Sequence, residues 1–126
     1  MEFFEITPRE RAMLARLRFC PAVFLGEGSL RNFRHMAAGY LAAMRNAGLR
    51  NLHNLLPDGL NEFTATQLNI GADNRDCFSM IAEAEPDDAK ALTRFFEILD
   101  AYLVHLGEEP LPAVSDWEQF RGIWPE

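Results

Sequence analysis

A chain of 126 residues, 48% of them hydrophobic, has the size of one domain and can bury a core, which excludes a disordered chain. Its net charge of −7 excludes non-specific binding to nucleic acid, because backbone phosphates repel an acidic protein. No apolar stretch approaches the ~20 residues of a membrane span, and the acidic N-terminus lacks the basic start of a secretory signal, so a cytosolic (cytoplasmic) location is expected.

The charge is unevenly distributed along the chain. Residues 1–50 carry eight Arg against four Glu, whereas residues 51–126 carry fifteen acidic residues against three Arg and one Lys. Such a division is typical of a protein whose acidic half attracts a basic partner, or of one whose halves neutralise each other on folding. The sequence leaves both interpretations open.

Capping residues mark the start of the first helix. Thr7, Pro8 and Glu10 form a capping-box pattern with proline at the first helical position. The helix is expected to run to residue 19, because Pro21 disfavours helical geometry at the residue before it. Residues 22–25 then form a short apolar run, which is expected to cross the core as an extended segment.

A second helix is predicted over residues 30–46, with Ser29 as its cap and Gly48 as its stop signal. Its apolar positions recur with helical spacing and are predicted to face the core. They are Leu30, Phe33, Ala37, Tyr40, Leu41 and Met44. The opposite side is flat enough to receive another helix, and it carries Arg31, Arg34, Ala38, Ala42 and Arg45.

Further helices are predicted over residues 60–69, 74–84 and 87–106, and a short last helix follows a capping pattern that begins at Ser115. Because the alternating polarity of strands is nearly absent, the fold is predicted to be all-α. We expect a compact orthogonal or irregular bundle of five to six helices in one domain spanning residues 1–126. The helices over 30–46 and 87–106 are expected at its centre.

No motif for catalysis, a metal or a cofactor rises above background. His35, His53 and His105 lie in three different elements without metal-site spacing, and whether the fold gathers them in a pocket is left open. Cys20 and Cys77 have no CxxC companion and are expected to be buried thiols. We therefore predict no catalytic residue, metal or cofactor, and expect that the protein is not an enzyme.

Two groups of residues are candidates for binding a partner. The first is a run of carboxylates that would steer a basic partner toward the protein. The second is a set of aromatic residues in the last helix, of the types favoured as interface anchors. The acidic candidates are Glu83, Glu85, Asp87, Asp88, Glu97 and Asp100, and the aromatic candidates are Trp117, Phe120 and Trp124.

Three segments together resemble a group of small, poorly characterised bacterial helical proteins, some of which look like immunity proteins of polymorphic toxin systems. The segments are PAVFLG at 21–26 with SL at 29–30 and GY at 39–40, GLNEF at 59–63, and DDA at 87–89 leading into FFEILD at 95–100. The resemblance implies a helical fold and a role in binding a partner. It transfers no specific functional residue.

These observations favour a non-enzymatic protein-binding domain, of an immunity type that neutralises a basic toxin or effector by covering it. The alternative is a self-associating structural or assembly subunit, a possible homodimer in which a basic face meets an acidic one. Neither nucleic acid nor a membrane is expected as a partner.

Overall fold

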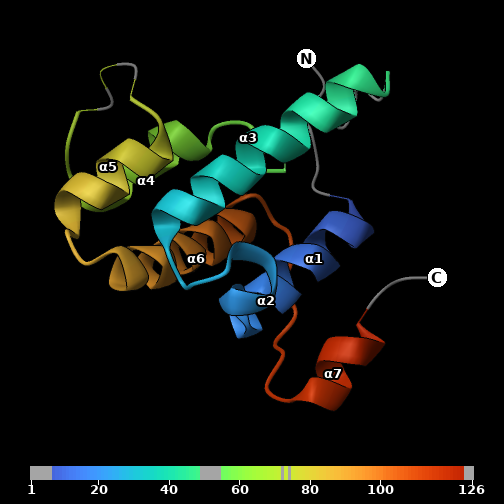
Figure 1. Ribbon diagram of the computed structural model, residues 1–126. Coiled ribbons are helices and arrows are strands. Elements are labelled where there is room, and N and C mark those ends of the chain that lie inside the picture. The colour runs from blue at the N-terminus through green and yellow to red at the C-terminus, as the bar shows by residue number, and fades with distance from the viewer. Residues whose placement is uncertain (1–6, 49–54, 72, 74, 124–126) are drawn as a thin grey trace.

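The computed structural model describes residues 7–48, 55–71, 73 and 75–123, which form seven helices and no strand (Figure 1). The all-α prediction is therefore confirmed for a single domain, with one helix more than the upper limit of the prediction. The additional helix lies in the apolar run after Pro21. His53 and Trp124 lie outside the described residues.

Helix α1 (Pro8–Phe19) begins with the predicted capping box, in which the Thr7 hydroxyl accepts from the Glu10 amide and the Glu10 carboxylate accepts from the Thr7 amide. Glu10 is also buried, and its second oxygen accepts from the Tyr40 hydroxyl at 2.7 Å. One carboxylate thus starts α1 and joins it to the middle of α3 (Leu30–Asn46). A buried charge is tolerated here because both of its oxygens are bonded.

Residues 21–25 correct the prediction of an extended segment across the core. They form a short helix, α2 (Pro21–Leu25), and none of its residues is buried. Pro21 occupies the first helical position, which suits its fixed φ, and Gly26 ends the helix at φ +78°. An apolar run of this length can be a strand or a helix, and periodicity alone does not distinguish them.

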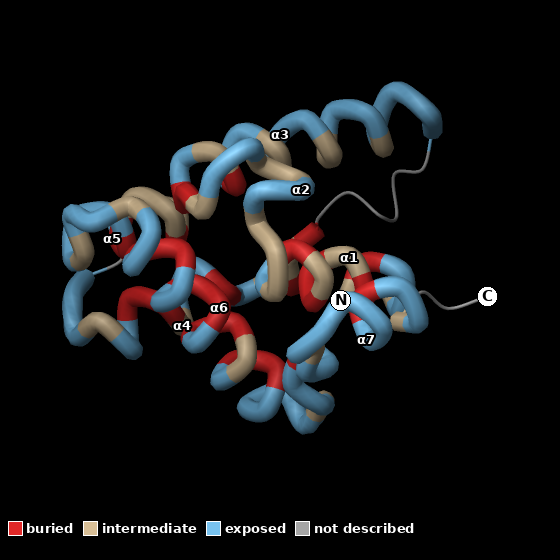
Figure 2. The backbone as a smooth tube through the Cα atoms, turned by 60° about the horizontal axis from the view of Figure 1, so that its bottom comes forward, coloured by how far each residue is buried: buried red, intermediate tan, exposed pale blue. Residues whose placement is uncertain are grey.

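Helix α3 has its predicted bounds and its predicted cap, since the Ser29 hydroxyl accepts from the Asn32 amide. Its burial differs from the prediction, because only Leu30 and Phe33 of the expected apolar face are buried. No residue from 39 to 46 is buried, and this half of the helix extends past the other described helices (Figures 1 and 2). Alanine and leucine supply helix propensity there in place of burial.

Helices α4 (Leu60–Leu68) and α5 (Cys77–Ala84) pack against each other. The Asn61 side-chain oxygen accepts from the Cys77 amide at 2.8 Å, so a residue of α4 helps to start α5. The Asp76 carboxylate caps α5 by accepting from the Ser79 amide. The predicted helix over 74–84 thus begins three residues later than expected.

Helix α6 (Asp88–His105) is the centre of the molecule and contacts α3, α4 and α5. Figure 2 shows that its middle turns are largely buried. Its apolar stripe meets Phe33 of α3, whose ring centre lies 4.9 Å from that of Phe95 and 5.9 Å from that of Phe96. The prediction of a central pair of helices is therefore right for α6 and right only for the first half of α3.

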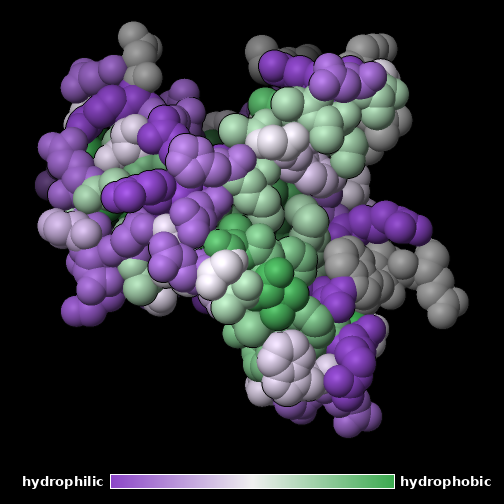
Figure 3. All heavy atoms as spheres, in the orientation of Figure 1, coloured by the Kyte–Doolittle hydropathy of each residue, from purple (hydrophilic) through white to green (hydrophobic). Residues whose placement is uncertain are grey.

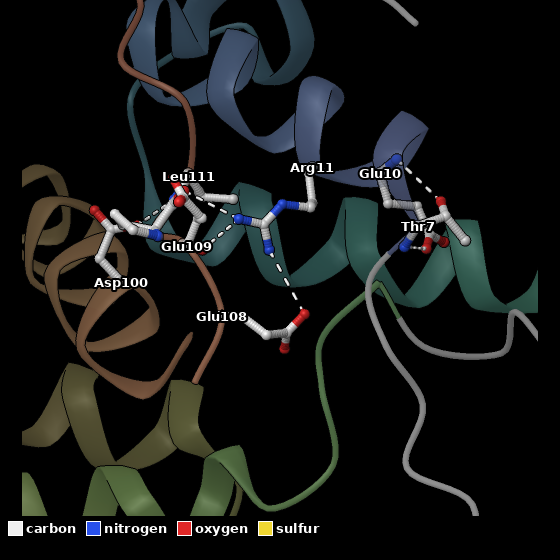
Figure 4. A network of polar contacts seen from close by, with 8 residues as sticks. Thr7, Glu10, Arg11, Asp100, Glu108, Glu109 and Leu111 are labelled. Carbon is white, nitrogen blue, oxygen red and sulfur yellow. Dashed lines mark hydrogen bonds and ion pairs between the residues drawn. The ribbon is translucent and has the colours of Figure 1, made fainter. Parts of the chain in front are cut away.

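The chain after α6 crosses the surface as an extended segment, residues 108–116, before the short helix α7 (Trp117–Gly122). Leu111 anchors this segment by burying its side chain and by donating its amide to Asp100 at 2.9 Å. Arg11 of α1 donates to the carbonyl oxygens of Glu109 and Pro110, and it lies 4.0 Å from the Glu108 carboxylate (Figure 4). The segment is thus held between α1 and α6.

Candidate functional site

The acidic candidates at the ends of α5 and α6 all have partners within the chain. Asp88 accepts from the Ser29 hydroxyl and from the Arg31 amide at 3.2 Å, so it fixes the start of α3 against the start of α6. Asp87 caps α6 by accepting from the Lys90 amide at 3.0 Å. Glu85 accepts from the Asp87 amide at 3.2 Å. These carboxylates complete the backbone hydrogen bonding of two helix starts.

The remaining acidic candidates form ion pairs. Asp100 accepts from Arg18 at 2.5 Å, Glu83 accepts from Arg75 at 2.5 Å, and Glu97 lies 3.5 Å from Arg94. The side chains of Glu83 and Glu97 are 72% and 53% exposed, so their pairs are weak and a partner can reach both carboxylates. Asp100 is less available to a partner, because it pairs with Arg18 and also accepts from the Leu111 amide.

Ion pairs also join the two halves of the chain. Arg11, Arg18 and Arg34 pair with Glu108, Asp100 and Asp76 respectively. The second interpretation of the charge asymmetry, mutual neutralisation on folding, is therefore partly realised. The run of carboxylates is correspondingly less available as a binding surface than its sequence indicates.

The aromatic candidates in α7 have two different environments. Phe120 is 7% exposed and lies under the Arg16 guanidinium, whose carbon is 4.0 Å from the ring centre. Trp117 is 49% exposed, although its ring centre is 5.0 Å from that of Phe120 and 5.2 Å from that of Phe19. Phe120 thus attaches α7 to α1, and Trp117 stays available on the outside of the same cluster.

The exposed Trp117 continues into an apolar area over α2. Val23 is 58% exposed, and Phe19 and Phe24 are partly exposed. Figure 3 shows hydrophobic atoms over α2 that extend toward α7, while hydrophilic atoms cover the side formed by α4 and α5. We call Phe19, Val23, Phe24 and Trp117 the aromatic face.

Three exposed carboxylates neighbour the aromatic face in sequence. Glu27 follows α2, and Asp116 and Glu118 flank Trp117. None of the three takes part in an ion pair within the described part of the chain. Sequence reasoning missed Val23 and Phe24 because it placed residues 22–25 in the core, and it did not single out Phe19 or Glu27 as candidates for binding a partner. The signal that could have found them is Pro21, a favoured first helical residue.

A groove of about 340 Å³ lies on another side of the molecule, between α3 and the segment that leads into α4. Arg34 lies in its wall and donates to Asp76 at 2.7 Å. The rest of the wall is mostly apolar, with Ala38, Leu41 and Phe78 among its residues. The groove is therefore lined mainly by apolar residues and carries three charged ones, Arg34, Asp58 and Asp76.

Cys77 lines this groove, but its thiol is unreactive. It is 2% exposed, and burial raises the pKa of its thiol to about 12, with a smaller contribution from the neighbouring Asp76 charge. A thiol that stays protonated is a poor nucleophile and a poor metal ligand. Cys77 is thus a buried thiol as predicted, whereas Cys20 is only half-buried.

The histidines do not assemble a site in the described part of the chain. His35 and His105 are both exposed, and His105 packs against Phe63 with 5.4 Å between ring centres. Within the described ranges, no group of three His, Cys, Asp or Glu residues could hold a metal ion. None of the described helices is long and apolar enough to cross a membrane.

Comparison with known proteins finds no matching family model, no similar curated protein and no similar solved structure. The resemblance to immunity-type proteins therefore stays a prediction.

Proposed function

We propose that this chain is a non-enzymatic protein-binding domain whose interface is centred on the aromatic face. The observation that carries the proposal is the half-exposed Trp117, whose ring packs against Phe19, with the exposed Val23 on the short helix α2 that follows Phe19 in sequence. Interfaces take most of their binding free energy from a few aromatic anchors, and tryptophan is prominent among these. Trp117 is already held by its neighbours, so little side-chain entropy is lost when a partner covers it.

The charge of the protein supports a basic partner, such as the toxin or effector that an immunity-type protein would cover. The chain carries a net charge of −7, which accelerates the approach of a cationic molecule. Glu27, Asp116 and Glu118 are exposed, take part in no ion pair within the described part of the chain, and lie next to the aromatic face in sequence. In this proposal they take over the role first given to the run from Glu83 to Asp100.

The test measures binding to the product of the neighbouring gene, with association and dissociation rates recorded at rising salt. Replacing Trp117 with alanine is expected to weaken binding by about thirtyfold, the loss typical of an interface anchor. Val23→Ser is expected to weaken binding, whereas Val104→Ser is the matched control, because both valines are 58% exposed and Val104 lies on α6. The control should bind within about twofold of the unaltered protein.

The salt series tests the basic partner separately from the aromatic face. Association should slow as salt rises, while dissociation changes little, because screening acts on the long-range field. Salt-independent association with a strong Trp117 effect would remove the basic partner and leave the aromatic face as an interface. Absence of binding, or equal effects of Val23→Ser and Val104→Ser, would contradict the proposed interface.

Self-association is a second candidate function, and the exposed half of α3 favours it. Leu41 and Met44 lie in that half and are only partly buried, so a second copy could cover them. Light scattering over a range of protein concentrations distinguishes the two functions. A dimer that Leu41→Ser and Met44→Ser convert to monomer would support self-association, and a monomer at every concentration would exclude it.

A further inference from the structure

The outer side of α3 is a basic surface on an acidic protein. Its residues are spaced so that they share one face of the helix, and all of them are exposed. We call this surface the basic stripe, and it consists of Arg31, Arg34, Ala38, Ala42 and Arg45. From the first arginine to the last it spans about 21 Å, at 1.5 Å per residue, or about four helical turns.

Folding leaves much of the positive charge of the basic stripe uncompensated. Arg34 pairs with Asp76, but the side chains of Arg31 and Arg45 take part in no ion pair within the described part of the chain. Asp88, which lies nearby, accepts from the backbone amide of Arg31 and not from its guanidinium. The two arginines at the ends of the stripe are therefore available to carboxylates of another molecule.

The groove beside α3 adjoins the basic stripe and is lined mainly by apolar residues. Its lining includes Arg34 and Ala38 of the stripe, together with Leu41 and, on the opposite wall, Leu56 and Pro57. The small side chains of Ala38 and Ala42 let another backbone approach α3 closely, because the distance between packed helices depends on the residues at the contact. The arginines, the apolar groove and the small alanine side chains thus lie next to one another along α3.

We propose that the basic stripe and the adjoining groove bind an acidic amphipathic helix of a partner protein. The apolar residues of that helix enter the groove, and its Glu or Asp residues meet Arg31, Arg34 and Arg45. This is the general mode in which an amphipathic helix lays its apolar face into a groove and charges set its orientation. The surface differs from the aromatic face in both position and charge, so the inference goes beyond the proposed function.

The acidic residues around the groove fix how the partner helix lies. Asp76 is neutralised by Arg34, whereas Asp58 lines the groove opposite α3 and has no ion pair within the described chain. Carboxylates of the partner would be repelled on the Asp58 side. Its acidic residues therefore lie on the α3 side, and its apolar residues face Leu56 and Pro57.

The test uses two fluorescent helical peptides of about 18 residues with the same leucine face. One carries Glu at every flanking position and the other carries Lys, and binding to the full chain is followed by fluorescence anisotropy at low salt. The Glu peptide is expected to bind at least about tenfold more tightly, because each charge reversal replaces attraction by repulsion. A duplex DNA of about 20 base pairs serves as a second anionic probe.

Charge-reversal variants locate the binding. Arg31→Glu with Arg45→Glu is expected to weaken binding of the Glu peptide at least about tenfold. Lys90→Glu with Arg121→Glu is the matched control, since both of these cations are exposed and form no ion pair with the residues that the structure describes. Circular dichroism confirms that both variants are folded. Trp117→Ala should leave peptide binding unchanged, which separates this surface from the aromatic face.

Several outcomes would overturn the inference. They are equal binding of the two peptides, equal loss in the test and control variants, and no binding of the Glu peptide. DNA that displaces the Glu peptide would assign the stripe to nucleic acid. A concentration-dependent dimer that Arg31→Glu with Arg45→Glu dissociates would assign it to a second copy of this chain.

Discussion

Gly59 is the residue where backbone and side chain are most tightly coupled. It begins α4 at φ +87°, and a Cβ there would clash with the hydroxyl of Tyr102 on α6. The same hydroxyl donates to the Asp58 carbonyl at 2.5 Å. Only glycine combines this backbone conformation with such a close approach. The turn before α4 is therefore fixed by contact with α6.

Replacing Gly59 with alanine should destabilise the protein by about 3 kcal/mol, from a left-handed backbone and an overpacked contact. Gly107→Ala is the control, because Gly107 has φ +81° but no atom within 4 Å of its added Cβ. It should cost only about 1–2 kcal/mol, for the backbone alone. Urea unfolding measures both variants, and equal losses would show that Tyr102 does not press on Gly59.

At the scale of elements, α7 packs against α1 through Phe120 and exposes Trp117 to solvent. Phe120 provides the attachment through Phe19 and Arg16, and the segment before it is fixed by Leu111. Replacing Phe120 with alanine should lower the free energy of unfolding by about 2–3 kcal/mol, since a nearly buried aromatic ring is lost. Trp117→Ala should cost under about 1 kcal/mol, because half of that side chain is already in water.

Urea unfolding of both α7 variants gives the comparison, with circular dichroism as a readout independent of tryptophan. The order of the two losses matters more than their size. If Trp117→Ala destabilised the chain as much as Phe120→Ala, the exposed tryptophan would be a structural residue. The aromatic face would then lose its proposed anchor.

At the scale of the whole molecule, three buried or partly buried groups with raised pKa values make the free energy of unfolding depend on pH in the alkaline range. Burial raises the pKa of the Cys77 thiol from 9.0 to about 12, and it also raises the pKa values of Tyr40 and Tyr102. For Tyr40, the adjacent Glu10 carboxylate adds to the effect. In all three cases the unfolded chain ionises first.

The contribution of the protonated Cys77 thiol to the free energy of unfolding is therefore fully present below pH 9, and it declines as the pH rises toward about 12. Between pH 8 and pH 10 the free energy of unfolding should fall by about 1.4 kcal/mol on account of this thiol alone. Cys77→Ala should remove that share of the fall, whereas Cys20→Ala should retain it. An identical pH dependence in both variants would contradict the assignment.

The ion pairs of the whole molecule explain why the charge asymmetry was only partly informative. Charge composition says how many arginines and carboxylates the chain has, but ion pairing depends on which ones the fold brings within about 4 Å. Arg18 and Asp100 are 82 residues apart in sequence and 2.5 Å apart in space. No local pattern predicts such a contact.

Local sequence determined the helices and most of their ends, because caps, prolines and glycines act within a few residues. Thr7, Ser29 and Asp87 cap α1, α3 and α6, and the capping pattern before α7 was displaced by one residue, to Asp116. Periodicity also identified the apolar face of α6. These are short-range effects, which a single sequence records directly.

Tertiary structure alone decided which faces stay exposed. The apolar pattern of α3 continues to Met44, and Tyr40 in its second half bonds to Glu10 of α1, but no residue from 39 to 46 is buried. The run from Val23 to Leu25 was expected in the core, but Val23 is exposed and Phe24 and Leu25 are only partly buried, while Glu10, predicted as a capping residue, is buried. Burial is a property of how elements pack, and packing is settled by contacts between residues far apart in the chain.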